Sequence, residues 1–131
     1  MATAPSYAAT PRLLAGLVPS TADTSWTAPT HVTSLGTGGT SGTKITQIDI
    51  IPVGTVVAGV VNVFAYDGTT YHLIEAVTIT AATLSTTAPG TKQTYAYDNF
   101  VLPSNTWSLA ISTTVSGNVS LVEVVAYGAD L

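Results

Sequence analysis

The chain has 131 residues, of which seven are acidic and three basic, and it contains no cysteine. Without cysteine, the sequence excludes disulfide bonds, thiolate catalysis and cysteine-ligated zinc. Three scattered cations cannot displace the counterions of a nucleic acid, so we expect no binding to DNA or RNA. The net charge of −4 also argues against anionic membrane surfaces.

Charged residues make up 8% of the chain, against roughly 25% in an average soluble domain. No stretch approaches the roughly 20 apolar residues of a membrane-spanning helix, and the amino-terminal region lacks the pattern of a signal peptide. A soluble chain with so few charges is easier to understand if other subunits cover much of its surface. The alternative is a robust monomer with a threonine-rich surface.

The first 24 residues predict an extended arm that precedes the folded domain. Three prolines interrupt this segment, and one helical turn at 13–17 is the only regular structure expected in it. Its apolar residues show no strand-like alternation, so we expect them to contact a partner. The alternative is that they fold back and cover an open sheet edge of the same chain. The expected contact residues are Arg12, Leu13, Leu14, Leu17 and Val18.

Residues 25–131 are expected to form one all-β domain. β-branched and aromatic residues dominate this region, turn signals recur at short intervals, and no long amphipathic helix is present. About seven to eight short antiparallel strands predict a β-sandwich of the jelly-roll kind. The expected strands cover 31–35, 44–52, 55–67, 69–80, 93–102, 106–114 and 118–128.

Apolar residues at alternate positions of these strands predict the core. Gly59, inside a long strand, indicates a bulge or a bend. The expected core residues are Ile48, Ile50, Val61, Val63, Leu73, Val77, Ile79, Phe100, Leu102, Trp107, Leu109, Ile111, Val122 and Val124.

The stretch "VFAYDGTTYHLIEAV" (63–77) concentrates polar and aromatic residues in a chain that otherwise has few of them. Asp67 and Gly68 stand between two β-rich runs and suit a two-residue type I′ turn, in which both central residues need a positive φ. Tyr66 and Thr69 would then face each other. We therefore interpret this stretch as a hairpin with a structural turn at Asp67 and Gly68.

No catalytic or metal-binding constellation emerges from the sequence. His72 and Glu75 are three residues apart on an expected strand, so they should point to opposite faces and share no metal. The seven acidic residues are spread singly, and "GTGGTSGTK" (36–44) does not match a phosphate-binding loop. We expect a protein that is not an enzyme and needs no cofactor or metal.

The aromatic residues allow two interpretations. A row of exposed rings can stack against sugars, whereas rings that face the core or a subunit interface only pack. Tyr95 and Tyr97 share one face of a strand because they are two residues apart. Packing is the favoured interpretation for all of them. The residues concerned are Trp26, Tyr66, Tyr71, Tyr95 and Tyr97.

Three segments together resemble a class of small virion proteins of tailed bacteriophages. They are "AGVVNVFAYDGTTYHLIEAVTITA" (58–81), "VLPSNTWSLAIST" (101–113) and "VVAYGADL" (124–131). The resemblance covers roughly residues 30–131 and leaves out the arm. Its motifs are turns and core strands, so no functional residue can be carried over from the family.

The resemblance implies a structural role in the virion. The leading expectation is a decoration, or cement, protein on the outer surface of the head, which contacts the major capsid protein or other virion proteins and stabilises capsomer junctions. A homo-oligomer is expected, with a trimer favoured by the symmetry of capsid lattices. The alternative is a receptor- or glycan-binding β-sandwich module of a tail tip or fibre.

Overall fold

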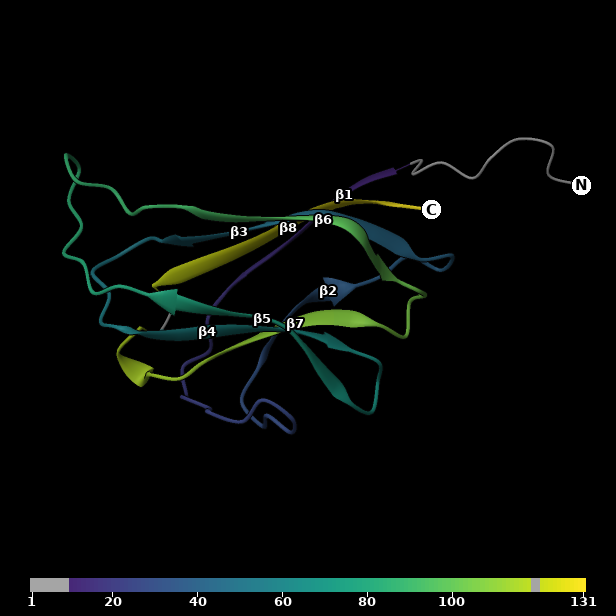
Figure 1. Ribbon diagram of the computed structural model, residues 1–131, viewed down its shortest axis with the longest axis horizontal. Helices are drawn as coiled ribbons and strands as arrows, with labels where there is room; N and C mark the ends of the chain where they lie inside the picture. Colours follow the sequence, from purple (N-terminus) through teal and green to yellow (C-terminus); the bar gives the residue numbers. More distant parts are fainter. Residues whose placement is uncertain (1–9, 119–120) are drawn as a thin grey trace, which may run out of the picture.

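The computed structural model describes residues 10–118 and 121–131 and consists of two stacked β-sheets (Figure 1). A single 3-10 helix, η1 (Ser116–Asn118), precedes the last strand. The strands are β1 (Thr10–Leu17), β2 (Thr33–Thr37), β3 (Thr43–Pro52), β4 (Gly59–Tyr66), β5 (Tyr71–Ile79), β6 (Gln93–Leu102), β7 (Ser108–Thr113) and β8 (Val122–Asp130).

The strand order is that of a jelly roll. Sheet A has the order β1-β8-β3-β6 and sheet B the order β2-β7-β4-β5. The first strand pairs with the eighth, the second with the seventh, the third with the sixth and the fourth with the fifth, all antiparallel. This pairing results when one long hairpin rolls up into two sheets. The prediction of an all-β antiparallel sandwich is confirmed. Among the described residues, no helix is long and apolar enough to cross a membrane.

The core lies between the two sheets, and most of the predicted core residues are fully buried in it. Three differ from the prediction: Phe100 and Trp107 are only partly buried, and Leu73 is 37% exposed. The core also contains residues that were not predicted. These are Leu14, Val18, Leu35, Ile45, Val56, Ala65 and Ala126.

The amino-terminal segment does not form the predicted arm within residues 10–17 but folds back along a sheet edge of its own chain, which was the alternative. Residues 10–17 form β1, which pairs with β8 along its whole length and is the edge strand of sheet A. The expected boundary after residue 24 is therefore wrong, and so is the helical turn at 13–17. Pro11 is compatible with this strand because an edge strand has one side without ladder partners. Residues 1–9 lie outside the described residues.

The alternation of β1 was hidden because both of its faces are apolar. Leu14 and Val18 point into the core, while Leu13 and Leu17 point outward. Gly16 lies between the inward residues, and a Cβ at this position would come within 2.9 Å of the Leu35 side chain. The absence of a side chain at Gly16 thus lets β1 pack closely over β2.

A β-bulge interrupts the pairing of β4 with β5. Val63 pairs with Glu75 and Phe64 with Leu73, so Ile74 is an extra residue on β5. The bulge was expected at Gly59, which instead begins β4. Because an extra residue reverses the alternation of the strand that carries it, the bulge changes which side chains of β5 share a face.

Polar side chains link the two sheets on both long sides of the sandwich. On one side, the Tyr97 hydroxyl donates to Glu75 Oε1 at 3.0 Å, which joins β6 to β5. Burial, reinforced by the Glu75 carboxylate, raises the pKa of Tyr97 well above its usual range. On the other side, Arg12 Nη2 donates to the Thr37 carbonyl at 2.8 Å and joins β1 to β2.

Candidate functional site

The residues expected to contact a partner divide into two groups. Leu14 and Val18 are 4% and 2% exposed, so they belong to the core of their own chain, which corrects their predicted role. Leu13 and Leu17 are 61% and 36% exposed and remain available for contact. The sequence pattern could not distinguish the buried leucine and valine from the exposed leucines, because it predicted no strand over this segment.

Arg12 is engaged within its own chain. Its Nη1 lies 3.0 Å from Asp130 Oδ1, and Asp130 also accepts a hydrogen bond of 2.6 Å from the Thr43 hydroxyl. The hydrogen bond from Thr43 and the guanidinium of Arg12 lower the pKa of Asp130, against a smaller effect of desolvation. Arg12 therefore fixes β1 to the carboxyl end of β8. The sequence had predicted instead that Arg12 would contact a partner.

Asp67 and Gly68 lie in the loop of the β4–β5 hairpin, but the loop has four residues. Tyr66 pairs with Tyr71, so the predicted two-residue type I′ turn and its pairing of Tyr66 with Thr69 are wrong. Asp67 Oδ1 accepts the backbone N–H groups of Thr69 and Thr70 at 2.8 and 2.7 Å. These bonds, Thr70 first, together with His72, lower the pKa of Asp67. Gly68 has a φ of 97°, which disfavours other residues there.

His72 and Glu75 point to the same side of sheet B, contrary to the prediction. His72 pairs with Ala65 and Glu75 with Val63, and both β4 residues belong to the core. The bulge at Ile74 causes this reversal. The two side chains nevertheless have separate partners, because His72 Nε2 lies 3.1 Å from Asp67 Oδ2 whereas Glu75 accepts from Tyr97. Within the described residues, no three histidine, aspartate or glutamate side chains could hold a metal ion.

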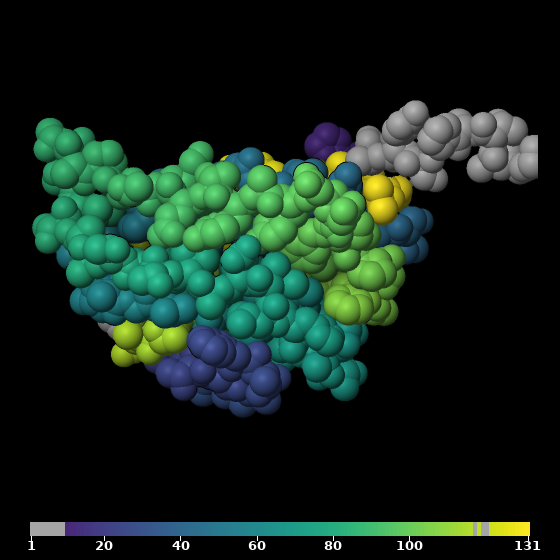
Figure 2. Space-filling model, in the orientation of Figure 1, coloured from purple at the N-terminus to yellow at the C-terminus, as the bar shows by residue number. Residues whose placement is uncertain are grey.

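The segment between β1 and β2, residues 18–32, covers the outer face of sheet B. It descends from sheet A and passes beneath sheet B in Figure 1, and its dark blue atoms lie at the bottom centre in Figure 2. Asp23 anchors it, because its backbone N–H donates to the Thr113 carbonyl on β7 at 2.8 Å. The indole of Trp26, in the same segment, also reaches the sheet, because Trp26 Nε1 donates a hydrogen bond of 3.1 Å to the buried Asn62 side chain.

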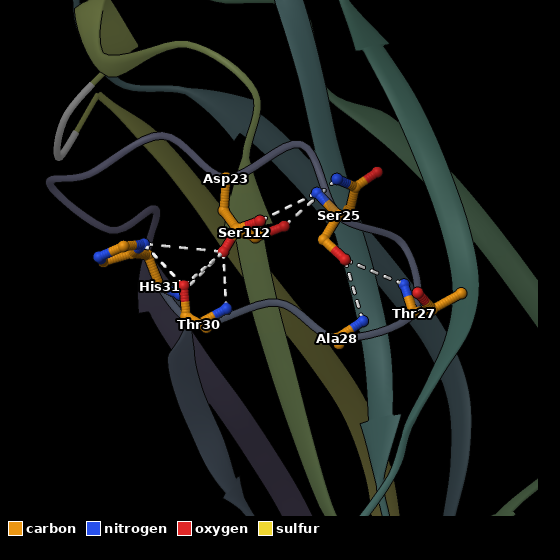
Figure 3. A network of polar contacts seen from close by, with 8 residues as sticks. Asp23, Ser25, Thr27, Ala28, Thr30, His31 and Ser112 are labelled. Carbon is orange, nitrogen blue, oxygen red and sulfur yellow. Dashed lines mark hydrogen bonds and ion pairs between the residues drawn. The ribbon is translucent and has the colours of Figure 1, made fainter.

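The Asp23 carboxylate organises this covering segment from within (Figure 3). It accepts the backbone N–H groups of Ser25, Thr30 and His31 at 2.9, 2.6 and 3.0 Å. These bonds, led by Ser25 and Thr30, lower the pKa of Asp23 to about 2, against a smaller opposing effect of desolvation. The carboxylate therefore holds the loop in one conformation above sheet B.

Asp23, His31 and Ser112 are drawn together in Figure 3, but the hydrogen bonds of these three residues do not form a catalytic triad. His31 Nδ1 lies 3.7 Å from Asp23 Oδ2 and 3.2 Å from the Thr30 hydroxyl. The Ser112 hydroxyl instead accepts a hydrogen bond of 3.2 Å from Asn62 Nδ2 inside the sheet. A triad needs the imidazole to bridge the acid and the nucleophile, and this imidazole contacts only the loop.

The outer face of sheet A, which we call the open face, has no covering segment among the described residues. Its outward side chains form rows across the four strands. One row is Leu13, Tyr127, Gln47 and Ala96, and the next is Ala15, Val125, Asp49 and Thr94. Four large apolar residues are exposed on it, namely Leu13 at 61%, Tyr127 at 40%, Val101 at 39% and Leu17 at 36%.

A buried carboxylate lies near the centre of the open face. The side chain of Asp49 is only 4% exposed and accepts hydrogen bonds from the Thr94 hydroxyl and from Gln47 Nε2, both at 2.8 Å. Lys92 Nζ is 3.7 Å away. Burial raises the pKa of Asp49, but the hydrogen bonds from Thr94 and Gln47 and the charge of Lys92 outweigh it, and the net shift is downward.

One end of the sandwich carries a shallow groove of about 540 Å³. It lies between the end of β3 and the segment that connects β5 to β6. None of its lining residues is charged. The lining residues are Ile51, Pro52, Val53, Gly54, Leu84, Ser85, Thr86, Pro89 and Gly90. The groove offers mainly apolar contact, and the polar side chains of its lining are the hydroxyls of Ser85 and Thr86.

The aromatic residues mostly pack against each other. Tyr66 and Tyr71 are stacked with their ring centroids 4.1 Å apart, and Phe64 meets Tyr71 edge-on. Tyr95 and Tyr97 are partly buried against the core. Trp26 is the one of the five residues singled out in the sequence that is classed as exposed, at 56%. A row of free rings suited to a sugar is therefore not formed by these residues.

The sequence pattern did not predict the two features that distinguish the outer faces of the sheets, namely the loop organised by Asp23 over sheet B and the open face of sheet A. Asp23 was one of seven scattered acids, although the run from Asp23 to Thr30, rich in serine, threonine and proline, is typical of a capped loop. The open face was missed because β1 was. A scan against protein-family models finds no match to this chain, and a search of curated proteins finds none either.

Proposed function

We propose that this protein is a structural component of a tailed-bacteriophage virion, a decoration or cement protein on the outer surface of the head. The observation that supports this most is the open face of sheet A. It presents four large exposed apolar side chains, and its central carboxylate is already satisfied within the chain. Such a face is suited to packing against another protein surface.

The mechanism would be mechanical. A jelly roll of this kind is a rigid body, because its two sheets share one core and are linked on both sides by polar contacts. Many copies bound at the joints between capsomers would add their individually weak contacts through avidity. The partner is the major capsid protein or another virion protein, and no catalytic step is involved.

The test is to add the purified protein to phage heads that lack it. We expect saturable binding in co-sedimentation and a rise of several degrees in the temperature at which the heads release their DNA. Electron microscopy of the decorated heads should show added density on the outer surface. Heads that neither bind the protein nor gain stability would contradict the proposal.

A glycan- or receptor-binding module of the tail is the second candidate. The jelly-roll architecture also occurs in lectins, and Trp26 presents an exposed indole whose N–H is fixed by Asn62. A glycan array distinguishes the two functions. Binding that disappears in Trp26→Ala would favour the tail module, whereas a decoration protein should give no signal.

A further inference from the structure

We propose that the open face is a self-association surface, on which a second copy of the chain packs face to face about a two-fold axis. This goes beyond the proposed function and does not rest on it, since a second copy on the open face would leave the contact with the capsid to other surfaces of the dimer. Three properties of the face carry it: its size, its charge balance and the distribution of its unpaired charges.

The size of the open face is close to what a stable dimer needs. Four strands about 4.8 Å apart and eight to ten residues long span roughly 20 by 30 Å, or about 600 Å² in projection. The protruding side chains of Leu13 and Tyr127 raise the accessible area above the projected area. Standard interfaces bury about 800 Å² on each partner, so one sheet face packed on another supplies nearly a whole interface.

The charges of the open face nearly balance within sheet A. Lys44 and Glu123 are outward-facing by their register, and Lys92 pairs with Asp49. Asp98, an exposed residue of β6, adds one negative charge, which gives two positive and three negative charges. A face with one sign of charge would repel its own copy in a two-fold contact, where the same patch meets itself. A face of mixed sign repels its copy much less.

The rest of the molecule carries most of the net charge. Arg12 and Asp130 neutralise each other, and the acids outside sheet A give −3 of the net charge of −4. These acids are Asp23, Asp67 and Glu75. A basic partner would be attracted to the surfaces that carry these acids, whereas two acidic copies meet with least repulsion on their least charged faces. The charge distribution thus favours a second copy as the occupant of the open face.

Lys44 and Glu123 fix how the copies face each other. Neither forms an ion pair within the described chain, and they lie toward opposite ends of the face, Lys44 beside Val101 and Glu123 beside Leu17. A two-fold axis in the interface and perpendicular to the strands places β3 over β3 with the ends exchanged. Lys44 of one copy is then offset sideways from Glu123 of the other by one strand spacing, about 5 Å, across the roughly 10 Å between packed sheets, which the two side chains together can span.

Analytical ultracentrifugation of the purified full-length chain tests the proposal. We expect the wild type to sediment as a dimer of the 13.3 kDa chain at micromolar concentrations. Tyr127→Lys, in the centre of the face, should raise the dimer Kd at least tenfold. The matched control is Leu73→Lys, which adds the same charge at a similarly exposed leucine of sheet B and should leave the Kd within threefold of wild type.

Charge reversal tests the arrangement of the two copies. Lys44→Glu and Glu123→Lys should each weaken the dimer about tenfold, because each places like charges opposite one another. The double variant Lys44→Glu/Glu123→Lys should restore the Kd to within about threefold of wild type. Such a rescue does not follow from a general loss of stability, which would be additive in the double variant.

Thiol labelling gives an independent measure that needs no disruptive substitution. The chain has no cysteine, so Ala15→Cys on the open face and Ala76→Cys on β5 each introduce a single thiol. The labelling rate of Ala15→Cys should fall at least fivefold from nanomolar to micromolar protein, and that of Ala76→Cys should not.

Four outcomes would overturn the proposal: a wild type that is monomeric at all concentrations, a trimer, a double variant as weak as the single ones, or equal weakening by Leu73→Lys. None of these measurements uses phage heads. A dimer that does not bind heads would overturn only the proposed function, and a monomer that binds them only the self-association.

Discussion

The two outer faces of this sandwich are treated in opposite ways. Residues 18–32 fold over sheet B, and the sheet beneath them carries fully buried Asn62 and Phe64. Sheet A has no such cover among the described residues, and large apolar side chains on it stay exposed. Among the described residues, the chain therefore covers the outer face of one sheet with its own loop and leaves the outer face of the other sheet exposed. The face left open is where contact with other molecules is expected.

The largest effect is expected from two adjacent leucines of β1 that face opposite sides of sheet A. Leu14→Ala should destabilise the protein by about 3 kcal/mol, because it leaves a cavity in the core. Leu13→Ala, one residue earlier and 61% exposed, should change stability by less than about 0.5 kcal/mol. Urea unfolding of both variants measures the difference. Equal and small effects would mean that β1 is not part of the sandwich in solution.

Removing the Asp23 carboxylate, which organises residues 18–32, should destabilise the protein by less. Asp23→Ala leaves the N–H groups of Ser25, Thr30 and His31 without their acceptor, which should cost about 2 kcal/mol. Thr27→Ala, in the same segment, is the control and should be nearly neutral. Trp26 fluorescence, recorded with Trp107 replaced by phenylalanine, should shift to the red as the cover loosens. Unchanged stability and fluorescence would contradict an anchoring role for Asp23.

Acid should remove the contribution of Asp23 in a defined range. Its folded-state pKa of about 2 lies below the ordinary value of 3.8, so Asp23 stabilises the fold above pH 4 and loses this effect as the pH falls toward 2. The free energies of unfolding of wild type and Asp23→Asn should differ by about 1–2 kcal/mol at neutral pH. The difference should shrink between pH 4 and 2. A constant difference over this range would show that the pKa of Asp23 is not lowered.

The smallest effect is expected at the ion pair of the open face. Lys92 is 54% exposed and 3.7 Å from Asp49, so Lys92→Met should cost less than about 0.5 kcal/mol. Thr94→Val removes a hydrogen bond of 2.8 Å to the same carboxylate and should cost more, about 1 kcal/mol. Thermal unfolding at low and high salt compares the two variants. A larger loss for Lys92→Met would mean that charge, and not hydrogen bonding, holds Asp49.

The sequence predicted the sandwich well where each strand has one apolar face. In β7, for example, Leu109 and Ile111 were assigned to the core, and both are fully buried. The prediction failed for β1, where Leu13 and Leu14 are equally apolar and no alternation is visible. It also failed at Ile74, since a bulge depends on how two strands pair and leaves no clear trace in either strand alone.

The candidate surface could not be predicted because it is a property of the assembled sheet. Leu13, Tyr127 and Val101 come from the beginning, the end and the later part of the chain, and only the strand order brings them onto one face. Asp49 was predicted as an isolated acid, and its partners Gln47 and Thr94 become partners through the pairing of β3 with β6. Sequence spacing carries no signal for such contacts.

The strand order of sheet A also determines when this protein can fold during its synthesis. β8 lies between β1 and β3, so β1 has no hydrogen-bonded neighbour among the described strands until β8 has left the ribosome. Until then, Leu14 and the inner residues of β3 lack the β8 side chains that complete their part of the core. Only the pair β3–β6 of sheet A can form before β8 is made, so we expect sheet A to stay incomplete until synthesis reaches β8, and folding to be slow, as is usual for sheets built from distant segments. During that interval the chain depends on its low concentration, or on a chaperone, to avoid aggregation.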